Sequence, residues 1–393
     1  MASSPPTDQP ARRVVIAGGG VAALEAMIAL RATAAGRVTV TLVSADETFT
    51  YRPQLVGEPF GLDRPARYPL DRLCRDNDTR FVRSPVAAVV PDDHRIVLGD
   101  RTELGYDTLI VAVGARMVPM FEHGVTFDRE TSPEDFVEVL ADLREGLAPR
   151  VAMVVPDSVS WTMPAYELAL MTAAWGAAEH PDQLSVSVVT HEPRPLAAFG
   201  KTVSDEVDRL LAAAGIAIEC GVHPDVLSHT GLRAGGHWVP IDRVVCLPHI
   251  TGPHLPGLPC DHGGFIPVDD LGRVPGVADV YAAGDATTMS IKQGGLAAQL
   301  AEVASRHIVA GLGDAPEAGV EPFRPVLRGV LRTPDGPRYM LAELEDVDGT
   351  STFSDEPLWS PPSKISSRWL APYLEQMETA GQSGEPGSAP AAG

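Results

Sequence analysis

Glycines near the start of the chain have the spacing that brings a peptide backbone close to a pyrophosphate. Gly18, Gly20 and Ala23 stand in the G-x-G-x-x-G/A pattern, directly after the β-branched run 14–16. The first glycine permits a tight turn, the second lets the backbone approach the anion, and the small Ala23 lets helix and strand pack closely. The chemistry expected at this stretch is therefore dinucleotide binding.

A second group of residues with binding chemistry follows much later in the chain. Gly284 and Asp285 come after a short apolar run, and Lys292 and Gln293 come just before a glycine-initiated helix expected over 294–309. The Asp285 carboxylate can accept a hydrogen bond from a sugar-like hydroxyl, and free N–H groups at the helix start favour partial negative charge. We expect the carboxylate and the N–H groups to face one pocket.

The elements that position the first glycines are predicted to form a strand–helix–strand unit. Residues 14–16 read as a buried parallel strand, a helix follows Gly20, Gly36 ends it, and 38–43 form the next strand. Ser44 then occupies the position where many dinucleotide folds have an acidic residue, and its hydroxyl can still bond a ribose.

Further segments are predicted to complete this half of the chain. The loop 48–61 either returns across a ligand or is an ordinary surface loop. Strands are expected at 86–90 and 95–98, and a buried strand at 109–113 ends at Gly114, where the backbone must pass close to another group.

A second, weaker strand–helix–strand unit is expected between residues 151 and 189. A helix over 132–147, with Ser132 as its N-cap, leads into it. The turn after its first strand has no glycine, and Asp157 and Trp161 stand where a phosphate would lie. Because the carboxylate repels phosphate and the larger side chains keep the backbone away, this unit is predicted to be a fold with a poor NAD(P)H site.

Composition narrows the class of protein. The 393 residues carry a formal net charge of −21, which argues against nucleic acid or anionic lipid as a partner. The four cysteines form no C-x-x-C, so neither a redox disulfide between neighbours nor a metal site is expected, and scattered thiols suit a reducing compartment. No apolar stretch approaches about 20 residues, the length of a transmembrane helix. We expect a cytoplasmic protein.

The C-terminal part is predicted to be a small α+β region. Two strands are expected within 322–341, and the spacing of Ile365, Trp369, Tyr373 and Met377 predicts an amphipathic helix. That helix has three interpretations: docking on the body of the protein, lying on a membrane surface, or forming the contact of a homodimer.

Together these motifs resemble those of flavoproteins with two dinucleotide-binding domains, and within them the sulfide:quinone oxidoreductases, flavocytochrome c sulfide dehydrogenases and type II NADH dehydrogenases. The resemblance covers roughly residues 13–312 and depends on GGGVAA, TLIVAVGA and VYAAGD in that order. PAYE at 164–167 and the Lys292-x-Gly294 sequence are similar to motifs of the sulfide:quinone branch.

The resemblance implies FAD as the cofactor and an α/β fold of two Rossmann-like domains, the second inserted in the first, with a small C-terminal α+β region. The implied boundaries are a disordered tail at 1–12, the two parts of an FAD-binding domain at 13–118 and 241–312, a second Rossmann-like domain at 119–240, a C-terminal region at 313–380 and a disordered tail at 381–393.

The same resemblance implies where the parts of the cofactor lie. The pyrophosphate is expected at Gly18, Gly20 and Ala23, the adenosine ribose at Ser44, the adenine at the backbone of Val86, the middle of the cofactor near Gly114, and the ribityl chain at Asp285. The other residues expected beside the cofactor are Arg52, Gly284, Lys292 and Gln293.

The chain departs from the sulfide:quinone oxidoreductases in its cysteines. In that family a cysteine lies shortly before the PAYE-like string, where this chain has Trp161, and here no cysteine lies between Cys74 and Cys220 or after Cys260. Sulfide chemistry needs a thiolate nucleophile, so ordinary sulfide oxidation is not expected.

The leading hypothesis is an FAD-dependent oxidoreductase that passes two electrons from a small-molecule donor to an acceptor such as a quinone. Lys292 would stabilise negative charge on the reduced ring, and Glu167 is the candidate proton carrier, with a helix N-terminal carboxylate as its alternative. His249 is a third catalytic candidate, with a structural histidine as the alternative, and Cys246 is expected to be buried and inert. An NAD(P)H-dependent reductase and a flavin-binding protein without turnover remain alternatives.

Overall fold

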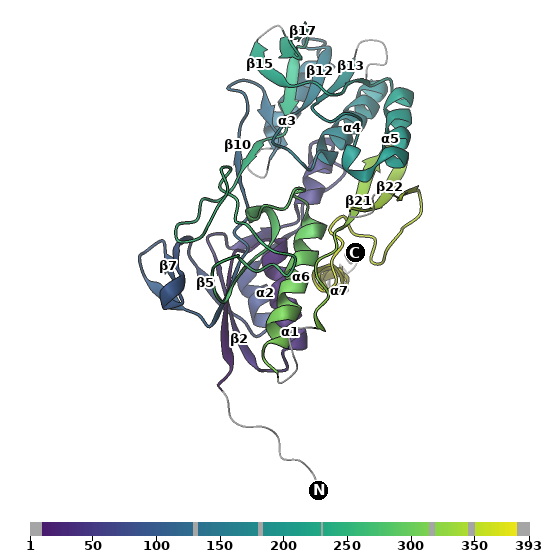
Figure 1. Cartoon of the computed structure of the whole chain (residues 1–393). Helices are drawn as coiled ribbons and strands as arrows, with labels where there is room; N and C mark the ends of the chain where they lie inside the picture. The colour runs from purple at the N-terminus through teal and green to yellow at the C-terminus, as the bar shows by residue number, and fades with distance from the viewer. Residues whose placement is uncertain are drawn as a thin grey trace, which may run out of the picture.

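The computed structural model describes residues 10–128, 133–179, 184–228, 231–313, 319–344 and 350–382. Two five-stranded parallel sheets organise these residues, one in the lower and one in the upper half of Figure 1. The disordered tails expected at 1–12 and 381–393 were each drawn too long. Arg12 is the first residue of a strand, and Gln382 is the last residue of a helix. The rest of both tails, and the expected cap Ser132, lie outside the described residues.

The first sheet contains the predicted dinucleotide unit and has the strand order β20-β9-β1-β2-β5. Its strands are β1 (Arg12–Ala17), β2 (Val38–Ser44), β5 (Arg80–Arg83), β9 (Thr108–Val111) and β20 (Val280–Ala282). Helices α1 (Val21–Thr33) and α6 (Gly294–Ala310) lie side by side on one face (Figure 1). Val14 and Ile16 pack toward these helices and Val15 and Ala17 toward the opposite face, which is why β1 is apolar throughout.

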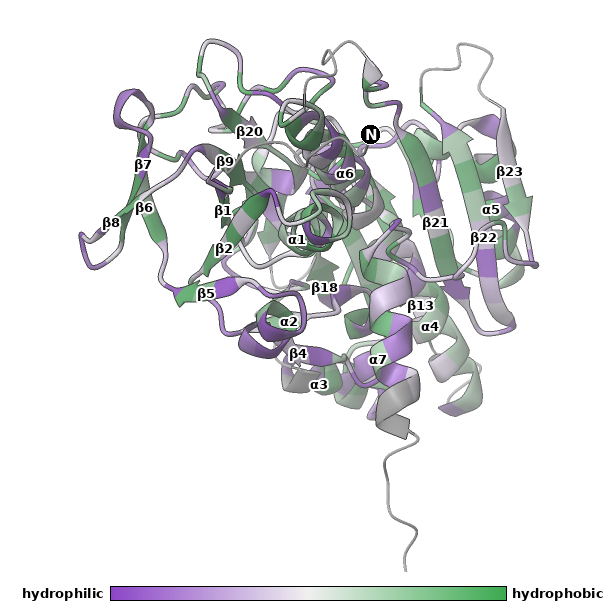
Figure 2. Ribbon diagram, turned by 90° about the horizontal axis from the view of Figure 1, so that it is seen from below, coloured by the Kyte–Doolittle hydropathy of each residue, from purple (hydrophilic) through white to green (hydrophobic). Residues whose placement is uncertain are grey.

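The opposite face of the first sheet packs against a small antiparallel sheet, whose strands are β6 (Val86–Val90), β7 (Arg95–Leu98) and β8 (Glu103–Gly105). Figure 2 shows β1 and β9 in the hydrophobic colour, between the helices and this small sheet. The expected strands at 86–90 and 95–98 are therefore confirmed, and the 3₁₀ turn η2 (Pro91–Asp93) joins them.

The second sheet has the strand order β11-β18-β12-β13-β14. Its strands are β11 (Val125–Thr126), β12 (Arg150–Val155), β13 (Ser185–Thr190), β14 (Ala217–Glu219) and β18 (Arg243–Cys246). One face packs on the helices α3 (Pro133–Arg144), α4 (Met163–Glu179) and α5 (Lys201–Ala213). The other packs on the strands β15 (Pro224–Ser228), β16 (Gly231–Ala234) and β17 (His237–Val239). The second strand–helix–strand unit is thus β12-α4-β13, as predicted.

Shorter elements connect and extend the two sheets. The chain runs from the first sheet to the second after β9 and returns after β18. On these two connections, β10 (Arg116–Val118) and β19 (His249–Thr251) pair as an antiparallel ribbon. The elements that follow β2 are β3 (Thr48–Thr50), the 3₁₀ helix η1 (Arg52–Phe60), β4 (Arg67–Pro69) and α2 (Leu70–Asp76). The remaining 3₁₀ turns are η3 (Ala197–Phe199) and η4 (Gly284–Ala286).

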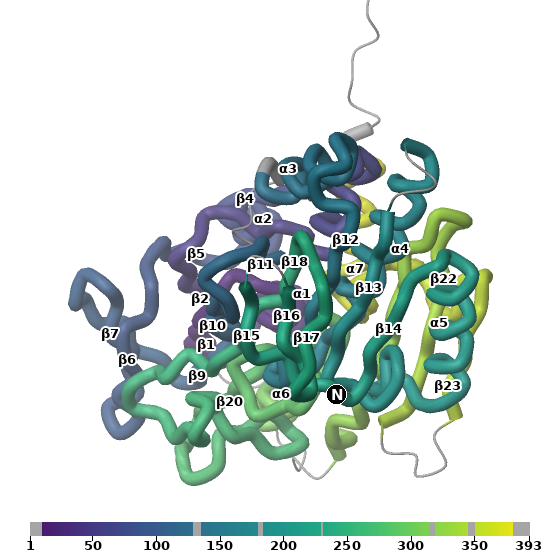
Figure 3. Tube along the Cα trace, turned by 90° about the horizontal axis from the view of Figure 1, so that it is seen from above, coloured from purple at the N-terminus to yellow at the C-terminus, as the bar shows by residue number. Residues whose placement is uncertain are grey.

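After α6 the chain adds a three-stranded antiparallel sheet, made of β21 (Val326–Thr333), β22 (Gly336–Glu343) and β23 (Ser351–Ser354). This sheet contributes Leu327, Leu331 and Met340 to the same core as α4 and α5, so the C-terminal sheet is packed on the second unit. Figure 3 shows β22 and β23 beside α5 at the edge of the molecule.

The last helix, α7 (Leu370–Gln382), docks on the body of the protein, which is one of the three interpretations of this segment. Leu370 and Leu374 are buried in the core of the first unit. The Glu25 carboxylate of α1, itself fully buried, accepts hydrogen bonds from the backbone N–H groups of residues 368, 369 and 370 at 3.0, 3.0 and 2.7 Å and so caps α7.

The expected i, i+4 series was wrong at its first two members, because α7 begins at Leu370 and both Ile365 and Trp369 precede it. Ile365 precedes the helix, is buried, and lies where a methyl group on Gly294 would contact it at 3.3 Å. The Ile365 side chain therefore belongs to a loop and packs against the start of α6. Within the described residues, no helix is long and apolar enough to cross a membrane.

Candidate functional site

The turn between β1 and α1 leaves the start of α1 open to an anion. Gly18 has φ +133°, and a Cβ there would lie 2.1 Å from the carbonyl oxygen of Ala112, so only glycine fits. Gly20 is the N-cap of α1, and a Cβ added to it would meet nothing within 4 Å. Among the described residues, no side chain caps α1 and its first turn has no acidic group. The free N–H groups and the helix dipole suit a pyrophosphate.

The Gly284–Asp285 turn meets the same end of α1. Gly284 has φ +77°, and a Cβ there would lie 3.3 Å from the Cβ of Ala22 in the first turn of α1. Asp285 is partly buried, and no group in the described part of the chain donates a hydrogen bond to its carboxylate. Burial raises the pKa of Asp285, while the positive charges of Arg52 and Lys292 act in the opposite direction. This carboxylate is therefore free to accept a hydrogen bond from a sugar-like hydroxyl.

The other residues expected at the cofactor lie around the same sheet edge. Ser44 is buried at the end of β2, accepts a hydrogen bond from the Asp46 N–H at 3.2 Å, and packs so closely on Gly19 that a Cβ there would lie 2.6 Å from its hydroxyl. Gly114 follows β9 with φ +75° and open space at its Cβ position. Val86 starts β6, two residues after Ser84, whose N–H donates to the Ser44 carbonyl at 2.9 Å.

Lys292 lies in the irregular stretch between η4 and α6. Its ammonium donates to the Thr287 carbonyl and stands 4.0 Å from the centre of the Phe265 ring. Burial lowers its pKa to about 8, and the charges of Asp285 and Asp261 oppose that shift. A lysine with a lowered pKa beside an unpartnered carboxylate is typical of a functional site.

Gln293 differs from the expectation of a free helix start. It is buried, and its side-chain oxygen accepts from the Leu296 N–H at 2.9 Å, so it is the N-cap of α6. Its amide nitrogen donates to the Arg328 carbonyl at 3.1 Å. Both ends of this side chain are therefore used within the protein, and the prediction of free N–H groups at this helix was wrong for Leu296.

In the second unit, the turn between β12 and α4 is filled by its own side chains. Val159 is 3% exposed, and the Trp161 ring lies 6.0 Å from the Phe199 ring. Ser158 and Ser160 each accept a hydrogen bond from a distant backbone N–H, from Ile250 at 3.3 Å and from Lys292 at 3.1 Å. Both serine hydroxyls of this turn are therefore engaged within the protein, whereas the turn before α1 consists of glycines.

Sequence reasoning missed Glu192, which follows β13 just as Ser44 ends β2. It is 6% exposed and accepts hydrogen bonds from the Tyr166 hydroxyl at 2.6 Å and the Ala197 N–H at 3.1 Å. Burial raises its pKa. An acidic residue at the end of the unit's second strand was the signal, but the carboxylate points inward.

Glu167 lies in the second turn of α4 and is 2% exposed. One carboxylate oxygen accepts from the Arg332 N–H at 2.6 Å and forms an ion pair with the Lys364 ammonium at 2.5 Å. Its partners are on β21 and in the stretch 361–378, which we call the C-terminal segment. The environment of Glu167 is therefore set by long-range contacts rather than by the helix dipole. Sequence reasoning missed Lys364, although it is one of only three lysines in the chain.

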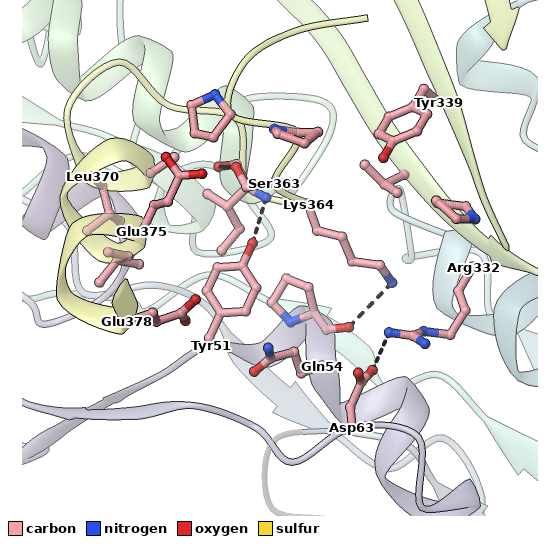
Figure 4. Close-up of a pocket in the computed structure, with 18 of the residues that line it drawn as sticks. Tyr51, Gln54, Asp63, Arg332, Tyr339, Ser363, Lys364, Leu370, Glu375 and Glu378 are labelled. Carbon is pink, nitrogen blue, oxygen red and sulfur yellow. Dashed lines mark hydrogen bonds and ion pairs between the residues drawn. The ribbon is translucent and has the colours of Figure 1, made fainter. Parts of the chain in front are cut away.

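Lys364 faces a cavity of about 470 Å³ between η1, the β21–β22 hairpin and the C-terminal segment (Figure 4). Its ammonium also donates to the Pro53 carbonyl at 3.4 Å, and the Arg332 guanidinium pairs with Asp63 at 2.5 Å on the same wall. The Tyr51 hydroxyl accepts from the Ile365 N–H at 3.1 Å. The remaining lining is mainly proline, aromatic and aliphatic, and includes Pro337, Tyr339, Pro361, Pro362, Leu370 and Leu374.

The remaining candidates lie outside this arrangement. His249 is exposed on β19, opposite Val118 of β10. All four cysteines are free. Cys246 is buried, as expected, and burial raises the pKa of its thiol to about 12, which disfavours the thiolate. No group of three His, Cys, Asp or Glu side chains in the described ranges could hold a metal ion.

Two parallel sheets, an open helix start beside an unpartnered carboxylate, and a second unit of the same topology define a protein with two dinucleotide-type folds. Residues 12–307 match the pyridine nucleotide-disulphide oxidoreductase family, and the chain belongs to that family. It is a flavin-dependent oxidoreductase, and its cofactor is FAD.

Known proteins of this class are similar over most of the chain. A sulfide-quinone reductase of Aquifex aeolicus is 24% identical over 273 residues, which are 62% of this chain and 60% of that relative. The solved sulfide:quinone oxidoreductase of the same organism has a TM-score of 0.79 at 19% identity, covering 94% of this chain and 90% of that one. An NAD-dependent persulfide reductase from A. fulgidus has a TM-score of 0.61 at 18% identity, covering 95% and 77%. At these identities the structural likeness establishes the fold.

Proposed function

We propose that this chain oxidises a small-molecule donor by two electrons and reduces a quinone. FAD supplies the two-electron redox chemistry. The observation that carries the proposal is the meeting of the open start of α1 with Gly284, where an added Cβ would lie 3.3 Å from that of Ala22. This junction joins an anion site to an unpartnered carboxylate, as a flavin dinucleotide requires.

The residues are assigned to the cofactor as follows. Gly18 and Gly20 are assigned to the pyrophosphate, where the buried Ala23 packs α1 on the sheet. Ser44 and the Val86 backbone are assigned to the adenosine, and Gly114 to the middle of the cofactor. Asp285 accepts from the ribityl chain, with Gly284 and Gln293 shaping the turn and helix beside it and Arg52 supplying positive charge. Lys292 stabilises negative charge at the pyrimidine end of the reduced ring.

The cavity beside Lys364 supports a quinone as the acceptor, which is also what the Aquifex aeolicus relatives are named for. Its volume of about 470 Å³ is that of a small-molecule pocket, and its proline and aromatic lining suits a flat ring. A quinone that becomes a quinol takes up two electrons and two protons. The Glu167–Lys364 pair is the proton carrier, because its ammonium reaches the cavity while its carboxylate is buried behind it.

The donor is proposed to be a small molecule other than NAD(P)H. The filled turn of the second unit, and the inward-facing Glu192, leave neither a phosphate site nor a free carboxylate for a ribose. An NAD(P)H-dependent reductase is nevertheless the second candidate, because the persulfide reductase with this fold is NAD-dependent by name.

Anaerobic spectroscopy of the purified holoprotein tests the proposal. NADH, NADPH, sulfide and polysulfide are added in turn and the flavin absorbance is followed, with and without a short-chain quinone. We expect neither nicotinamide to bleach the flavin, and flavin reduced by dithionite to be reoxidised by the quinone. Bleaching by NADH within seconds would favour the second candidate. Flavin that no quinone reoxidises would leave a flavin-binding protein without turnover.

A further inference from the structure

The turn between β12 and α4 reaches away from its own sheet to the flavin side of the molecule. Ser160 belongs to this turn, and its hydroxyl accepts the hydrogen bond of the Lys292 backbone N–H at 3.1 Å, across 132 positions of sequence. In a nucleotide-binding unit this turn would meet a phosphate. Here its hydroxyl contacts the segment that carries the lysine.

We infer that this turn positions Lys292 instead of binding a phosphate, and that Ser160 is the positioning residue. The inference rests on the proposed role of Lys292 at the pyrimidine end of the flavin. Ser160 acts through the backbone of Lys292 and does not itself touch the cofactor.

Lys292 needs such a support because its own segment is irregular. Residues 288–293 form no helix or strand, so the Lys292 N–H has no partner in regular secondary structure. Its ammonium is held at one end by the Thr287 carbonyl and the Phe265 ring. The Ser160 hydroxyl fixes the other end of the residue, and its loss leaves a partly buried backbone donor unpaired.

The turn that provides Ser160 is itself rigid. Val159 is buried in the main core, and its N–H donates to the Pro156 carbonyl at 3.0 Å. Trp161 packs on Phe199 on the other side of Ser160. Because both neighbours are anchored, the Ser160 hydroxyl is held at a defined place, as a positioning residue requires.

The first test follows the Lys292 amine in the protein without added FAD. Brief acylation across a pH series, read by mass spectrometry, gives the pH at which each lysine becomes reactive. The chain has three lysines, and exposed Lys201 is the internal reference. We expect a midpoint of about 8 for Lys292 in the parent protein. Ser160→Ala is expected to move it toward the ordinary value, because the segment loosens and the ammonium is better hydrated, and Ser160→Thr to restore it.

The matched control is Ser158→Ala. Ser158 is in the same turn and accepts the same kind of bond, but from Ile250 of β19. We expect this change to leave the Lys292 midpoint where it is. Equal shifts in Ser158→Ala and Ser160→Ala would mean that the turn acts only as general structure and would overturn the inference. So would a Ser160→Ala midpoint unchanged from the parent.

The second test measures the flavin redox equilibrium of the holoprotein against a reference dye. Lys292→Met defines the full effect of losing the charge, and Ser160→Ala is expected to disfavour the reduced form about 3- to 10-fold, the range of one hydrogen bond. A shift in Lys292→Met without one in Ser160→Ala contradicts the positioning inference alone. No shift in Lys292→Met removes the proposed role of Lys292, and a chain that binds no FAD removes the proposed function.

Discussion

The two strand–helix–strand units have the same topology, but the turn between strand and helix is open in the first unit and filled by side chains in the second. In the β1-α1 unit three glycines leave the helix start open, and an added Cβ at Gly20 would meet nothing within 4 Å. In the β12-α4 unit Val159 and Trp161 fill the corresponding place, and the serine hydroxyls of the turn bond to distant backbone groups. The comparison teaches that the strand order makes a nucleotide site available, and that the side chains of one short turn decide whether it exists.

The units also share a buried glutamate as the fifth residue of their helices. Glu25 of α1 and Glu167 of α4 both contact the C-terminal segment, Glu25 through three backbone N–H groups and Glu167 through Lys364. Glu167 also accepts from the Arg332 N–H of β21. Only Glu167 has a cation as its partner. Burial raises the pKa of Glu25 to about 7, against the opposing effect of its three backbone donors.

The largest expected effect is a loss of folding stability and FAD binding on substitution of Gly18, which Gly20 in the same turn should not show to the same degree. Gly18→Ala is predicted to abolish FAD binding and lower the free energy of unfolding by about 2–4 kcal/mol, because its Cβ would lie 2.1 Å from a carbonyl oxygen at a positive φ. Gly20→Ala should fold normally and bind FAD about 10- to 100-fold more weakly, because its methyl group enters the space for the pyrophosphate. Flavin content and thermal unfolding measure both. Full flavin content in Gly18→Ala would break the comparison between the turns.

The next effect separates two buried carboxylates of the second unit. Glu167→Gln and Lys364→Met are each predicted to lower quinone turnover about 100-fold, because proton delivery to the cavity is lost. Glu192→Gln should leave turnover within about twofold of the parent, since the Glu192 carboxylate faces Tyr166 and not the cavity. Steady-state rates at matched flavin content decide the matter. Equal losses in Glu167→Gln and Glu192→Gln would contradict the assignment.

A smaller effect is expected at Asp285. Asp285→Asn should raise the Kd for FAD about 10-fold, because a neutral amide oxygen is a weaker acceptor than a carboxylate for a ribityl hydroxyl. Titration of the apoprotein with FAD, followed by flavin fluorescence, measures it. Glu192→Gln is the control and should not change this Kd. An unchanged Kd in Asp285→Asn would mean that the carboxylate does not face the cofactor.

The most gradual effect is a pH dependence of stability that arises in the first unit. Because burial raises the pKa of Glu25 to about 7, the folded state binds this proton more tightly than the unfolded state. Stability should therefore rise as the pH falls from about 7 toward the ordinary value of 4.5, by at most about 1.4 kcal/mol per pH unit. Glu25→Gln should flatten this part of the profile in thermal unfolding between pH 5 and 8. A slope that survives the substitution would assign it to another group.

Much of the fold could be predicted because its signals are local. The glycine turn between a β-branched strand and an apolar helix predicted the first unit. The absence of glycine at 156–162 predicted that the turn of the second unit differs from it. The tight turn at Gly18 followed from the first of these patterns, whereas the meeting of the Gly284 turn with α1 was expected only from the resemblance to the flavoproteins.

The rest could not be predicted because it depends on long-range contacts. Glu167 and Lys364 are 197 positions apart, and nothing in either neighbourhood indicates the other. The start of α7 was misplaced because Ile365 has helical spacing by coincidence while Glu25, far away in sequence, determines where the helix begins. Gln293 looked like part of an open helix start, but its side chain folds back to cap the helix.

The cap that Glu25 provides has a consequence for how the molecule is assembled. The helix that offers its start to the cofactor receives its partner N–H groups from residues made 343 to 345 positions later on the ribosome. Without those donors, the folded α1 would hold a buried carboxylate that accepts none of these three hydrogen bonds. The last helix is therefore part of the support of the helix that meets the cofactor, although the two are at opposite ends of the chain.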